Sequence, residues 1–404
     1  MQTYLVGGAV RDLLLGREVT ERDWLVAGAT ADKLRAMGYR QVGKDFPIFL
    51  HPQTHEEYAL PRRYRKDIGS DPVSIEEDLT RRDLTINALA QGEDGEIIDP
   101  CGGQSDLNNR ILRHTLAFAE DPIRVLRLAR FAARYHAVGF TIAPETEQLV
   151  REMVAAGSLN NLVSERVWME IAKAMTEDSA HIFIKVLHEM GALAKIMPEL
   201  DRLFGVPQPE KYHPEVDTGL HTLLVLEQAC QLSSDPQVRF AALVHDLGKG
   251  TTSKEILPSH HGHEERGAKL IKPFSKRLNV PNTWRNLAII VARYHTHCHR
   301  AFELRPKTLL QTMLALDAFR KPQRFEQFLL VCEADVRGRT GLEGRDYSQA
   351  DYFRAVWHAA MEVDTAAISR SEPEPQRIAA QIQQERRRAI AAVKEEWKTA
   401  TVIQ

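Results

Sequence analysis

The hydrophobic pattern of this chain changes once, near residue 115, and this change limits the possible folds more than any other feature. Before it, short apolar segments alternate with glycine-rich breaks, which predicts strands mixed with helices. After it, apolar residues recur every three to four positions and strand signals almost vanish, which predicts helices. The sequence therefore predicts the α+β class, with a small α/β head followed by a long all-helical body.

Individual elements can be predicted from the same pattern. The expected strands are Tyr4–Val6, Trp24–Ala27, Phe46–His51 and Glu56–Leu60, and the expected helices of the head are Val10–Leu15 and Thr30–Met37. The expected helices of the body are Pro122–Tyr135, Pro144–Ala156, Ser164–Met175, Ala180–Glu189, His221–Leu232, Val238–Leu247, Glu264–Leu278, Asn286–Tyr294, Pro306–Ala315 and Phe325–Val336. Proline-rich segments at 207–214 and 371–375 divide the body. We therefore expect four domains, covering residues 1–115, 116–212, 213–340 and 341–404.

Composition places the chain among ordinary soluble proteins. Hydrophobic residues make up 43% and charged residues 27%, and the formal net charge is −2. This balance excludes a uniformly basic nucleic-acid binder but allows a local basic groove. The four cysteines form no CxxC pair, which is typical of a reducing compartment. No apolar run approaches the roughly 18 residues of a membrane span. We therefore expect a cytoplasmic protein with no signal peptide and no membrane contact.

Two motifs near the N-terminus suit the binding of phosphates and divalent cations. The stretch from Leu5 to Asp12 predicts strand, glycine turn and helix, and such a turn lets backbone N–H groups approach a phosphate. Glu21 and Asp23 are two residues apart, so on an extended chain both carboxylates point to one face. Two such carboxylates can hold two cations that activate a 3′-hydroxyl and stabilise a leaving pyrophosphate. Each motif alone also fits a plain structural turn.

Two further segments carry donors and acceptors for a nucleotide. The segment Arg81–Ala88 offers a guanidinium for a triphosphate, and a carboxylate and an amide for a ribose hydroxyl. Residues 110–134 contain six arginines and two acids, a local surplus of four positive charges. Within it, Asp121 and Arg124 place an acceptor beside a donor. This pair matches the edges of cytosine and adenine and rejects guanine and uracil.

These four motifs, in this order, resemble those of the bacterial (class II) tRNA nucleotidyltransferases, the CCA-adding enzymes. The matching stretches are GGAVRD at 7–12, ERDW at 21–24, RRDLTINA at 81–88, EDPIRVLRLAR at 120–130 and LVSERVWMEI at 162–171. The resemblance implies a polymerase-beta-like nucleotidyltransferase head, followed by an all-helical neck and body. It also implies addition of C, C and A to the 3′ end of tRNA from CTP and ATP.

The resemblance carries specific residues with it. It implies that Glu21 and Asp23 are catalytic and bind magnesium. The nucleotide-binding residues that it implies are Gly8, Arg11, Arg82, Asp83, Asn87, Asp121, Arg124, Arg127 and Arg130. Two places differ from the family pattern. The family has Asp where this chain has Glu21, and magnesium demands near-octahedral geometry. The loop around 67–75 is shorter than the family's flexible loop, which helps the switch from C to A addition. A partial enzyme that adds only the two C residues is therefore an alternative.

Histidine is unevenly distributed along the chain. Of 16 histidines, nine lie between His213 and His299. One of these histidines, His245, is followed directly by Asp246. Imidazole together with carboxylate suits transition metals such as manganese, iron, nickel or zinc. This part resembles the HD superfamily of metal-dependent phosphohydrolases. The residues that match its metal-binding pattern are His221, His245, Asp246 and Asp335, with His263 and His295 at positions that some members use for a second metal or a phosphate.

The HD resemblance implies a second activity. In one branch of the CCA-adding enzymes it implies 2′,3′-cyclic phosphodiesterase, 2′-nucleotidase and phosphatase activities that nickel favours, with His245 and Asp246 catalytic. We expect His297 and His299 to face solvent. The alternatives are a phosphohydrolase with a decayed RNA-binding head, a poly(A) polymerase, which shares the head, and a tRNA-binding scaffold. The protein is expected to be a monomer or a homodimer.

Overall fold

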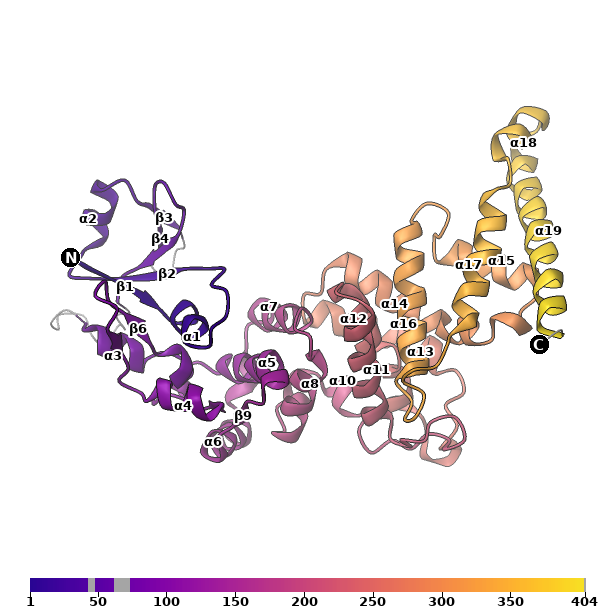
Figure 1. Cartoon of the computed structure of the whole chain (residues 1–404). Helices are drawn as coiled ribbons and strands as arrows, with labels where there is room; N and C mark the ends of the chain where they lie inside the picture. Colours follow the sequence, from indigo (N-terminus) through magenta and orange to yellow (C-terminus); the bar gives the residue numbers. More distant parts are fainter. Residues whose placement is uncertain (43–47, 62–72, 403–404) are drawn as a thin grey trace. The chain divides into compact units, whose positions relative to one another are not determined.

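The computed structural model describes residues 1–42, 48–61 and 73–402 (Figure 1). The chain forms two compact units. The first is Met1–Leu162 with Glu189–Ala192, and the second is Val163–His188 with Leu193–Gln404. The first unit contains a sheet with helices, and the regular elements described in the second are helices. The predicted α+β class is confirmed, and the predicted division into four domains stays a prediction.

A seven-stranded sheet forms the centre of the first unit, in the order β3-β4-β5-β2-β1-β6-β7 (Figure 1). Its strands are β1 (Gln2–Val6), β2 (Asp23–Ala27), β3 (Arg40–Val42), β4 (Ile48–Leu50), β5 (Glu57–Ala59), β6 (Ala90–Gln91) and β7 (Ile97–Ile98). β2 and β5 run parallel, and the other neighbours are antiparallel. Asp23 at the start of β2 pairs with Val6 on one side and with Glu57 on the other. The first site is positioned where β1 ends and β2 begins.

The first unit also contains helices. They are α1 (Gly8–Leu14), α2 (Ala31–Ala36), α3 (Ile75–Thr80), α4 (Gly103–Asn109), α5 (Arg124–Tyr135) and α6 (Pro144–Ala155). α3 begins with a capping box, because the Ser74 side chain accepts from Glu77 N and the Glu77 side chain accepts from Ser74 N. Leu79 of α3 is buried in one cluster with Val6 and Leu25 of the sheet. A short parallel pair, β8 (Ile111–Leu112) and β9 (Thr141–Ile142), follows.

The second unit is built from helices around an aromatic core. Its helices are α7 (Ser164–Ala174), α8 (Ala180–Glu189), α9 (Leu193–Ile196), α10 (Pro198–Asp201), α11 (Thr218–Leu232), α12 (Pro236–Val244), α13 (His263–Arg277), α14 (Asn282–His299), α15 (Pro306–Ala315), α16 (Pro322–Arg337), α17 (Ser348–Met361), α18 (Thr365–Ser371) and α19 (Pro375–Val402). α12 and α16 each pack against both α11 and α14. Phe240 of α12, Phe274 of α13 and Phe328 of α16 are fully buried. The side chains of Asp217 and Asp235 cap α11 and α12.

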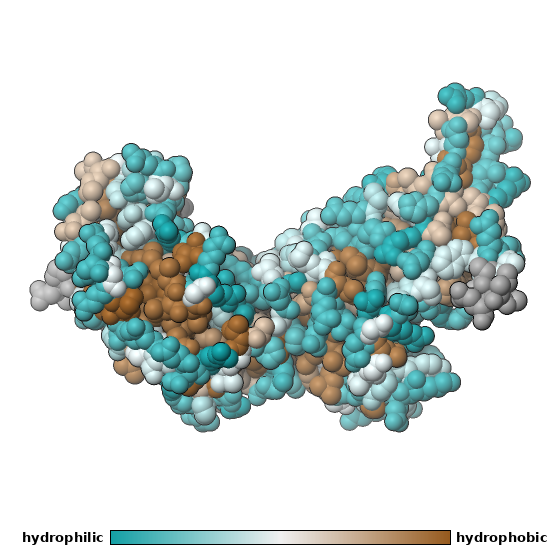
Figure 2. Space-filling view, viewed as in Figure 1, coloured by the Kyte–Doolittle hydropathy of each residue, from teal (hydrophilic) through white to brown (hydrophobic). Residues whose placement is uncertain are grey.

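Most predicted elements are present, with their ends shifted by a few residues. The helix predicted at 238–247 ends at Val244, so His245 and Asp246 follow it directly. The strand predicted at 46–51 lies partly outside the described residues, and β4 covers its later part. Among the described residues, no helix is both long and apolar enough to cross a membrane. Figure 2 shows hydrophilic side chains over most of the face in view, interrupted by smaller apolar areas.

Candidate active sites

A glycine turn joins β1 to α1, as predicted. Gly7 has a φ of +66°, a conformation that L side chains rarely adopt. A Cβ atom at Gly7 would lie 2.6 Å from Nη1 of Arg82, so this guanidinium lies directly against the turn. Arg82 also donates to the Asp78 carboxylate at 3.3 Å. Gly8 begins α1, so the turn offers a helix N-terminus and a cation side by side. The binding of a phosphate there stays a prediction.

Three carboxylates gather where β2 begins. Asp23 is the first residue of β2, Glu57 lies opposite it on β5, and Glu21 precedes the strand. Desolvation raises the pKa of Asp23, while Arg82 opposes this shift and Glu21 adds to it. Desolvation also raises the pKa of Glu57, and Asp23 and Glu21 add to that shift. The three groups therefore repel one another, and a bound cation relieves such repulsion.

The donor set of this first site fits magnesium, which prefers carboxylate oxygens. Glu57 was not expected from the sequence, because its place beside Asp23 depends on the parallel pairing of β2 with β5. The carboxylates here are more widely spaced than the ligands of the second site. In the described part of the chain, the sets of three or more His, Cys, Asp or Glu residues whose ligand atoms all lie within 4.8 Å of one another are in the second unit.

A chain of polar contacts links α1 to α5. Nη1 of Arg11 donates to Oδ1 of Asn87 at 2.6 Å, and Nδ2 of Asn87 donates to Oδ1 of Asp83 at 3.0 Å. Nε of Arg127 donates to the other oxygen of Asp83 at 2.7 Å. Arg11 is only 3% exposed and also donates to Asp12 at 2.9 Å. Burial acts to raise the pKa of Asp83, but Arg127 and Asn87 outweigh it and hold this pKa well below its usual range. Contacts of these residues with a nucleotide stay predictions.

Arg124 ties the first turn of α5 to the segment that follows α3. It is buried, and its guanidinium donates to the backbone carbonyls of Arg81 at 2.7 Å and of Arg82 at 3.1 Å. It also donates to the carbonyl of Ala117. Arg124 is therefore a structural residue in this conformation, and its predicted contact with a base edge stays a prediction.

The other predicted residues of this segment lie on or beside α5. Asp121 precedes the helix, and its Oδ1 accepts from the backbone N–H of Ile123 at 3.3 Å. Arg130 is buried, with its guanidinium carbon 4.6 Å from the centre of the Phe131 ring. Arg127 lies over the same ring at 5.8 Å. The predicted nucleotide-binding residues thus all lie in the first unit.

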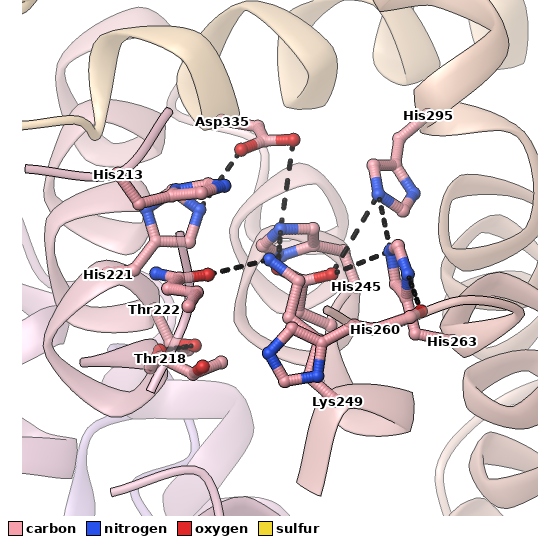
Figure 3. A network of polar contacts seen from close by, with 12 residues as sticks. His213, Thr218, His221, Thr222, His245, Lys249, His260, His263, His295 and Asp335 are labelled. Atoms are coloured by element: carbon pink, nitrogen blue, oxygen red, sulfur yellow. Dashed lines mark hydrogen bonds and ion pairs between the residues drawn. The ribbon is translucent and has the colours of Figure 1, made fainter. Parts of the chain in front are cut away.

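The second site lies among helices of the second unit (Figure 3). Its residues are His221 on α11, His245 and Asp246 after α12, His263 at the start of α13, His295 on α14 and Asp335 on α16. All but one of them are at most 3% exposed, and His263 is half buried. The structure therefore brings together all the residues that the HD resemblance implied as ligands.

The ligand atoms on one side of this site have the spacing of a metal centre. Nε2 of His245 lies 3.2 Å from Oδ2 of Asp246. Nε2 of His221 lies 3.1 Å from Oδ1 of Asp335. Two ligands that sit about 2.1 Å from one ion, at right angles to each other, are about 3 Å apart. These distances therefore fit a transition-metal ion held by imidazole and carboxylate.

Hydrogen bonds set which ring nitrogen faces the centre of the site. Nδ1 of His245, His263 and His295 each lies 2.7–3.1 Å from a backbone carbonyl three or four residues earlier. A carbonyl only accepts, so Nδ1 carries the hydrogen and Nε2 offers its lone pair to an ion. Nε2 of His263 and of His295 lie 3.4 Å and 3.8 Å from Oδ1 of Asp246. Burial lowers the pKa of His295 to about 3, which keeps this ring neutral.

Two buried atoms at the centre have no hydrogen-bond partner within the described part of the chain. They are Nε2 of His245 and Oδ1 of Asp246. Burying such atoms is unfavourable unless an ion or another group pairs with them. Burial acts to raise the pKa of Asp246, but His245 and Lys249 outweigh it and hold this pKa well below its usual range. The donor set and the unpaired atoms fit a metal ion.

Residues outside the predicted ligand set complete the surroundings. Nζ of Lys249 lies 2.7 Å from Oδ2 of Asp246 and 2.8 Å from Oε1 of Gln208. Oε1 of Glu215 lies 2.9 Å from Nδ1 of His221. Sequence spacing gives no sign of Gln208 or Glu215, because both reach the site from a loop that precedes α11.

The expectation that His297 and His299 face solvent is wrong. Nε2 of His299 lies 2.7 Å from Oδ2 of Asp335, so this ring contacts the site. His297 is half buried, and its Nδ1 lies 2.8 Å from the Thr312 hydroxyl. The spacing contained a signal for His299, because it follows His295 by one helical turn on the same face of α14.

Comparisons with known proteins match segments of both units. Three family models match: "Poly A polymerase head domain" at residues 3–113, "Probable RNA and SrmB-binding site of polymerase A" at 139–204, and "HD domain" at 218–355. The multifunctional CCA protein of Thioalkalivibrio sulfidiphilus is 55% identical over 98% of this chain and 100% of its own length. That of Teredinibacter turnerae is 58% identical over 90% of this chain and 91% of its own.

Solved structures share the fold. The CCA-adding enzyme of Bacillus stearothermophilus in complex with CTP matches with a TM-score of 0.64 at 23% identity, over 100% of this chain and 95% of that one. Another CCA-adding enzyme with CTP matches with a TM-score of 0.65 at 20% identity, over 99% of this chain and 91% of that one.

The fold and these matches thus define a class of enzyme in which a nucleotidyltransferase head is joined to an HD domain. Identity above one half over nearly the whole chain narrows that class to one family. The chain belongs to the multifunctional CCA proteins, tRNA nucleotidyltransferases that carry an HD domain.

Proposed function

We propose that the head adds C, C and A to the 3′ end of tRNA, with CTP and ATP as substrates. The observation that supports this most is the gathering of Glu21, Asp23 and Glu57 beside the glycine turn. Glu21 and Asp23 hold magnesium, which when bound stabilises the charge of the attacking hydroxyl and of the leaving pyrophosphate. The N–H groups at Gly8 and the guanidinium of Arg82 bind the triphosphate and orient it toward the tRNA end.

The remaining residues select the nucleotide. Asp83 and Asn87 hydrogen-bond the ribose, while Asp121 and Arg124 pair with the base edge. For this, Arg124 exchanges one of its backbone carbonyl partners for the base. Positive charge around the triphosphate comes from the arginines Arg11, Arg127 and Arg130.

A tRNA that lacks its CCA end tests the first activity. The full-length protein with CTP and ATP is expected to produce CCA ends on sequencing. Asp23→Asn is expected to abolish incorporation, and Asp32→Asn, which changes an exposed acid on α2, is the matched control. Ends that stop at CC support the partial enzyme, long A tails support a poly(A) polymerase, and no incorporation supports a decayed head.

We further propose that the HD domain hydrolyses phosphate esters at RNA ends, as a 2′,3′-cyclic phosphodiesterase, 2′-nucleotidase and phosphatase. The observation that supports this most is that Nε2 of His245 and Oδ1 of Asp246 are buried without a hydrogen-bond partner in the described part of the chain. The ligands His221, His245, Asp246 and Asp335 hold nickel or another transition metal, which when bound lowers the pKa of a coordinated water. His263 and His295 hold a second ion or the phosphate.

Hydrolysis of 2′,3′-cyclic AMP, 2′-AMP and p-nitrophenyl phosphate, with nickel, manganese, zinc or magnesium after chelation, tests the second activity. Asp246→Asn is expected to lower the rate on the order of a hundredfold or more, since it removes a ligand. CTP incorporation is expected to stay unchanged. Asp346→Asn, at an exposed position, is the matched control. An unchanged rate in Asp246→Asn contradicts the proposal.

The two activities act on the same RNA end. A 3′ end blocked by a cyclic phosphate offers no free hydroxyl for extension, so the HD domain clears such ends before the head repairs them. A His245→Ala protein that repairs cyclic-phosphate-ended tRNA as fast as the parent contradicts this coupling. The proposed setting is the cytoplasm, with tRNA as partner and no membrane contact. Light scattering distinguishes the proposed monomer from the homodimer.

A further inference from the structure

A loop that precedes the matched HD domain forms one wall of the second site. This loop, residues 207–217, lies between the second and third family-model matches. The carbonyl of Pro207 lies 3.1 Å from Nε2 of His260. The backbone N–H of Gln208 donates to the carbonyl of Val216 at 2.8 Å, and Gln208 is only 1% exposed. The loop is therefore closed on itself and packed against the site.

Glu215 is the residue of this loop that reaches a metal ligand. Its Oε1 lies 2.9 Å from Nδ1 of His221, 3.1 Å from Nδ1 of His213 and 3.3 Å from Nε2 of Gln208. The Glu215 side chain is 3% exposed. Nε2 of the Gln208 amide can only donate, so Oε1 of Glu215 acts as an acceptor. Glu215 is thus a buried acceptor in contact with His221.

The contact with Glu215 decides how His221 presents itself. Oε1 of Glu215 accepts from the Gln208 amide, so Nδ1 of His221, 2.9 Å from this oxygen, carries the hydrogen and Nε2 is left with a lone pair. That Nε2 faces Oδ1 of Asp335, another acceptor, at 3.1 Å. An ion between these two atoms satisfies both. The rings of His245 and His295 are set by backbone carbonyls, whereas His221 is set by a side chain.

We propose that Glu215 is a positioning residue of the HD metal site, which fixes the tautomer and the ring orientation of His221. This inference rests on the proposed phosphohydrolase function. It assigns to the loop at 207–217 a role in metal binding, although this loop lies outside the matched HD domain. Loss of such an outer partner typically costs about 10–100-fold in metal affinity or activity.

Glu215→Gln in the full-length chain tests this role. A glutamine amide can donate to Nδ1 of His221, which allows the tautomer with a hydrogen on Nε2. Nickel binding is measured by calorimetry, and hydrolysis of 2′,3′-cyclic AMP is measured against nickel concentration. We expect the Kd for nickel to rise about 10–100-fold, with the rate restored at saturating nickel. The nickel Kd of Glu215→Asp, which keeps the charge, is expected to lie between the values of the parent and of Glu215→Gln.

Matched controls separate positioning from a folding defect. Glu210→Gln makes the same change at an exposed position of the same loop and is expected to behave as the parent. CTP incorporation is expected to be unchanged in every variant. In a His221→Ala background, Glu215→Gln is expected to change the nickel Kd no further, because Glu215 acts through His221.

Each contrary result has one meaning. A parental nickel Kd in Glu215→Gln overturns the positioning role, and so does a further loss in the His221→Ala background. If Glu215→Gln does not fold, Glu215→Asp decides. The positioning role is then overturned if this variant keeps the parental Kd for nickel but loses hydrolysis. A parent protein that binds no nickel and hydrolyses no phosphate ester overturns the proposed phosphohydrolase function, and this inference falls with it.

Discussion

Replacing Gly7 by alanine tests whether the turn between β1 and α1 places Arg82 for the triphosphate. Gly7 has a φ of +66°, and a Cβ atom there would lie 2.6 Å from Nη1 of Arg82. The substitution therefore has two separable costs. The backbone must hold an L residue in a disfavoured region, and the guanidinium must move away from the turn. Gly16, which follows α1 with a φ of +64°, has nothing within 4 Å of an added Cβ, so Gly16→Ala carries the first cost alone.

The size of each cost follows from this comparison. Holding an L residue in a sparsely populated region costs about 1–3 kcal/mol, so both variants are expected to lose free energy of unfolding in this range. Displacing Arg82 removes a hydrogen bond between charged groups, worth about 1.5–3 kcal/mol in the complex with a triphosphate. At about 1.4 kcal/mol per tenfold, Gly7→Ala is expected to slow CTP incorporation about tenfold to a hundredfold. Gly16→Ala is expected to keep the parental rate.

Single-turnover incorporation of CTP into tRNA lacking its CCA end measures the rate, and urea unfolding measures the stability. The proposed hydrolysis by the HD domain serves as an internal control, because the second unit is untouched. The reasoning is refuted if Gly7→Ala loses stability but incorporates CTP within twofold of Gly16→Ala. In that case Arg82 either moves at no cost or does not act on the triphosphate.

Two further predictions concern stability. Arg124→Ala removes donors to the carbonyls of Arg81, Arg82 and Ala117, so we expect the free energy of unfolding to fall by about 3 kcal/mol or more, by urea unfolding. A loss no larger than that of Arg134→Ala, an exposed site on α5, contradicts this. Burial lowers the pKa of His260 to about 4, so its contribution to stability is complete above about pH 6.5 and is lost as pH falls through 4. Between pH 7 and pH 5, with a chelator present, the free energy of unfolding is expected to fall by about 2 kcal/mol from this group. A His260→Gln protein whose stability depends on pH as the parent's does contradicts this.

Local spacing predicted much of the fold and of both sites. Apolar residues at three-to-four spacing marked most helices of the second unit, because burial of one helix face leaves that period in any sequence. The pair Glu21 and Asp23 and the pair His245 and Asp246 were visible because their members are neighbours in the chain. Predicted ends were less accurate, since caps such as Asp217 move them by a few residues.

Residues that reach a site from a distant segment were missed. Glu57 joins Asp23 through the parallel register of β2 and β5, and Glu215 joins His221 across a loop that no spacing rule describes. His299 was assigned to solvent, although it contacts Asp335. Arg11 is predicted to contact nucleotide, and the structure places it in a buried contact with Asn87. Such contacts depend on the packing of several elements at once.

The sequence by itself determined that this chain has a mixed head and a helical body, and which residue types are available for two candidate metal sites. Composition and local period suffice for that, because secondary structure and burial leave a short-range record. Only the tertiary structure decided which acids stand together, which histidine nitrogen faces the centre of the HD site, and which atoms remain unpaired there. These are properties of distances between distant segments, and ionisation and metal binding depend on distances rather than on sequence position.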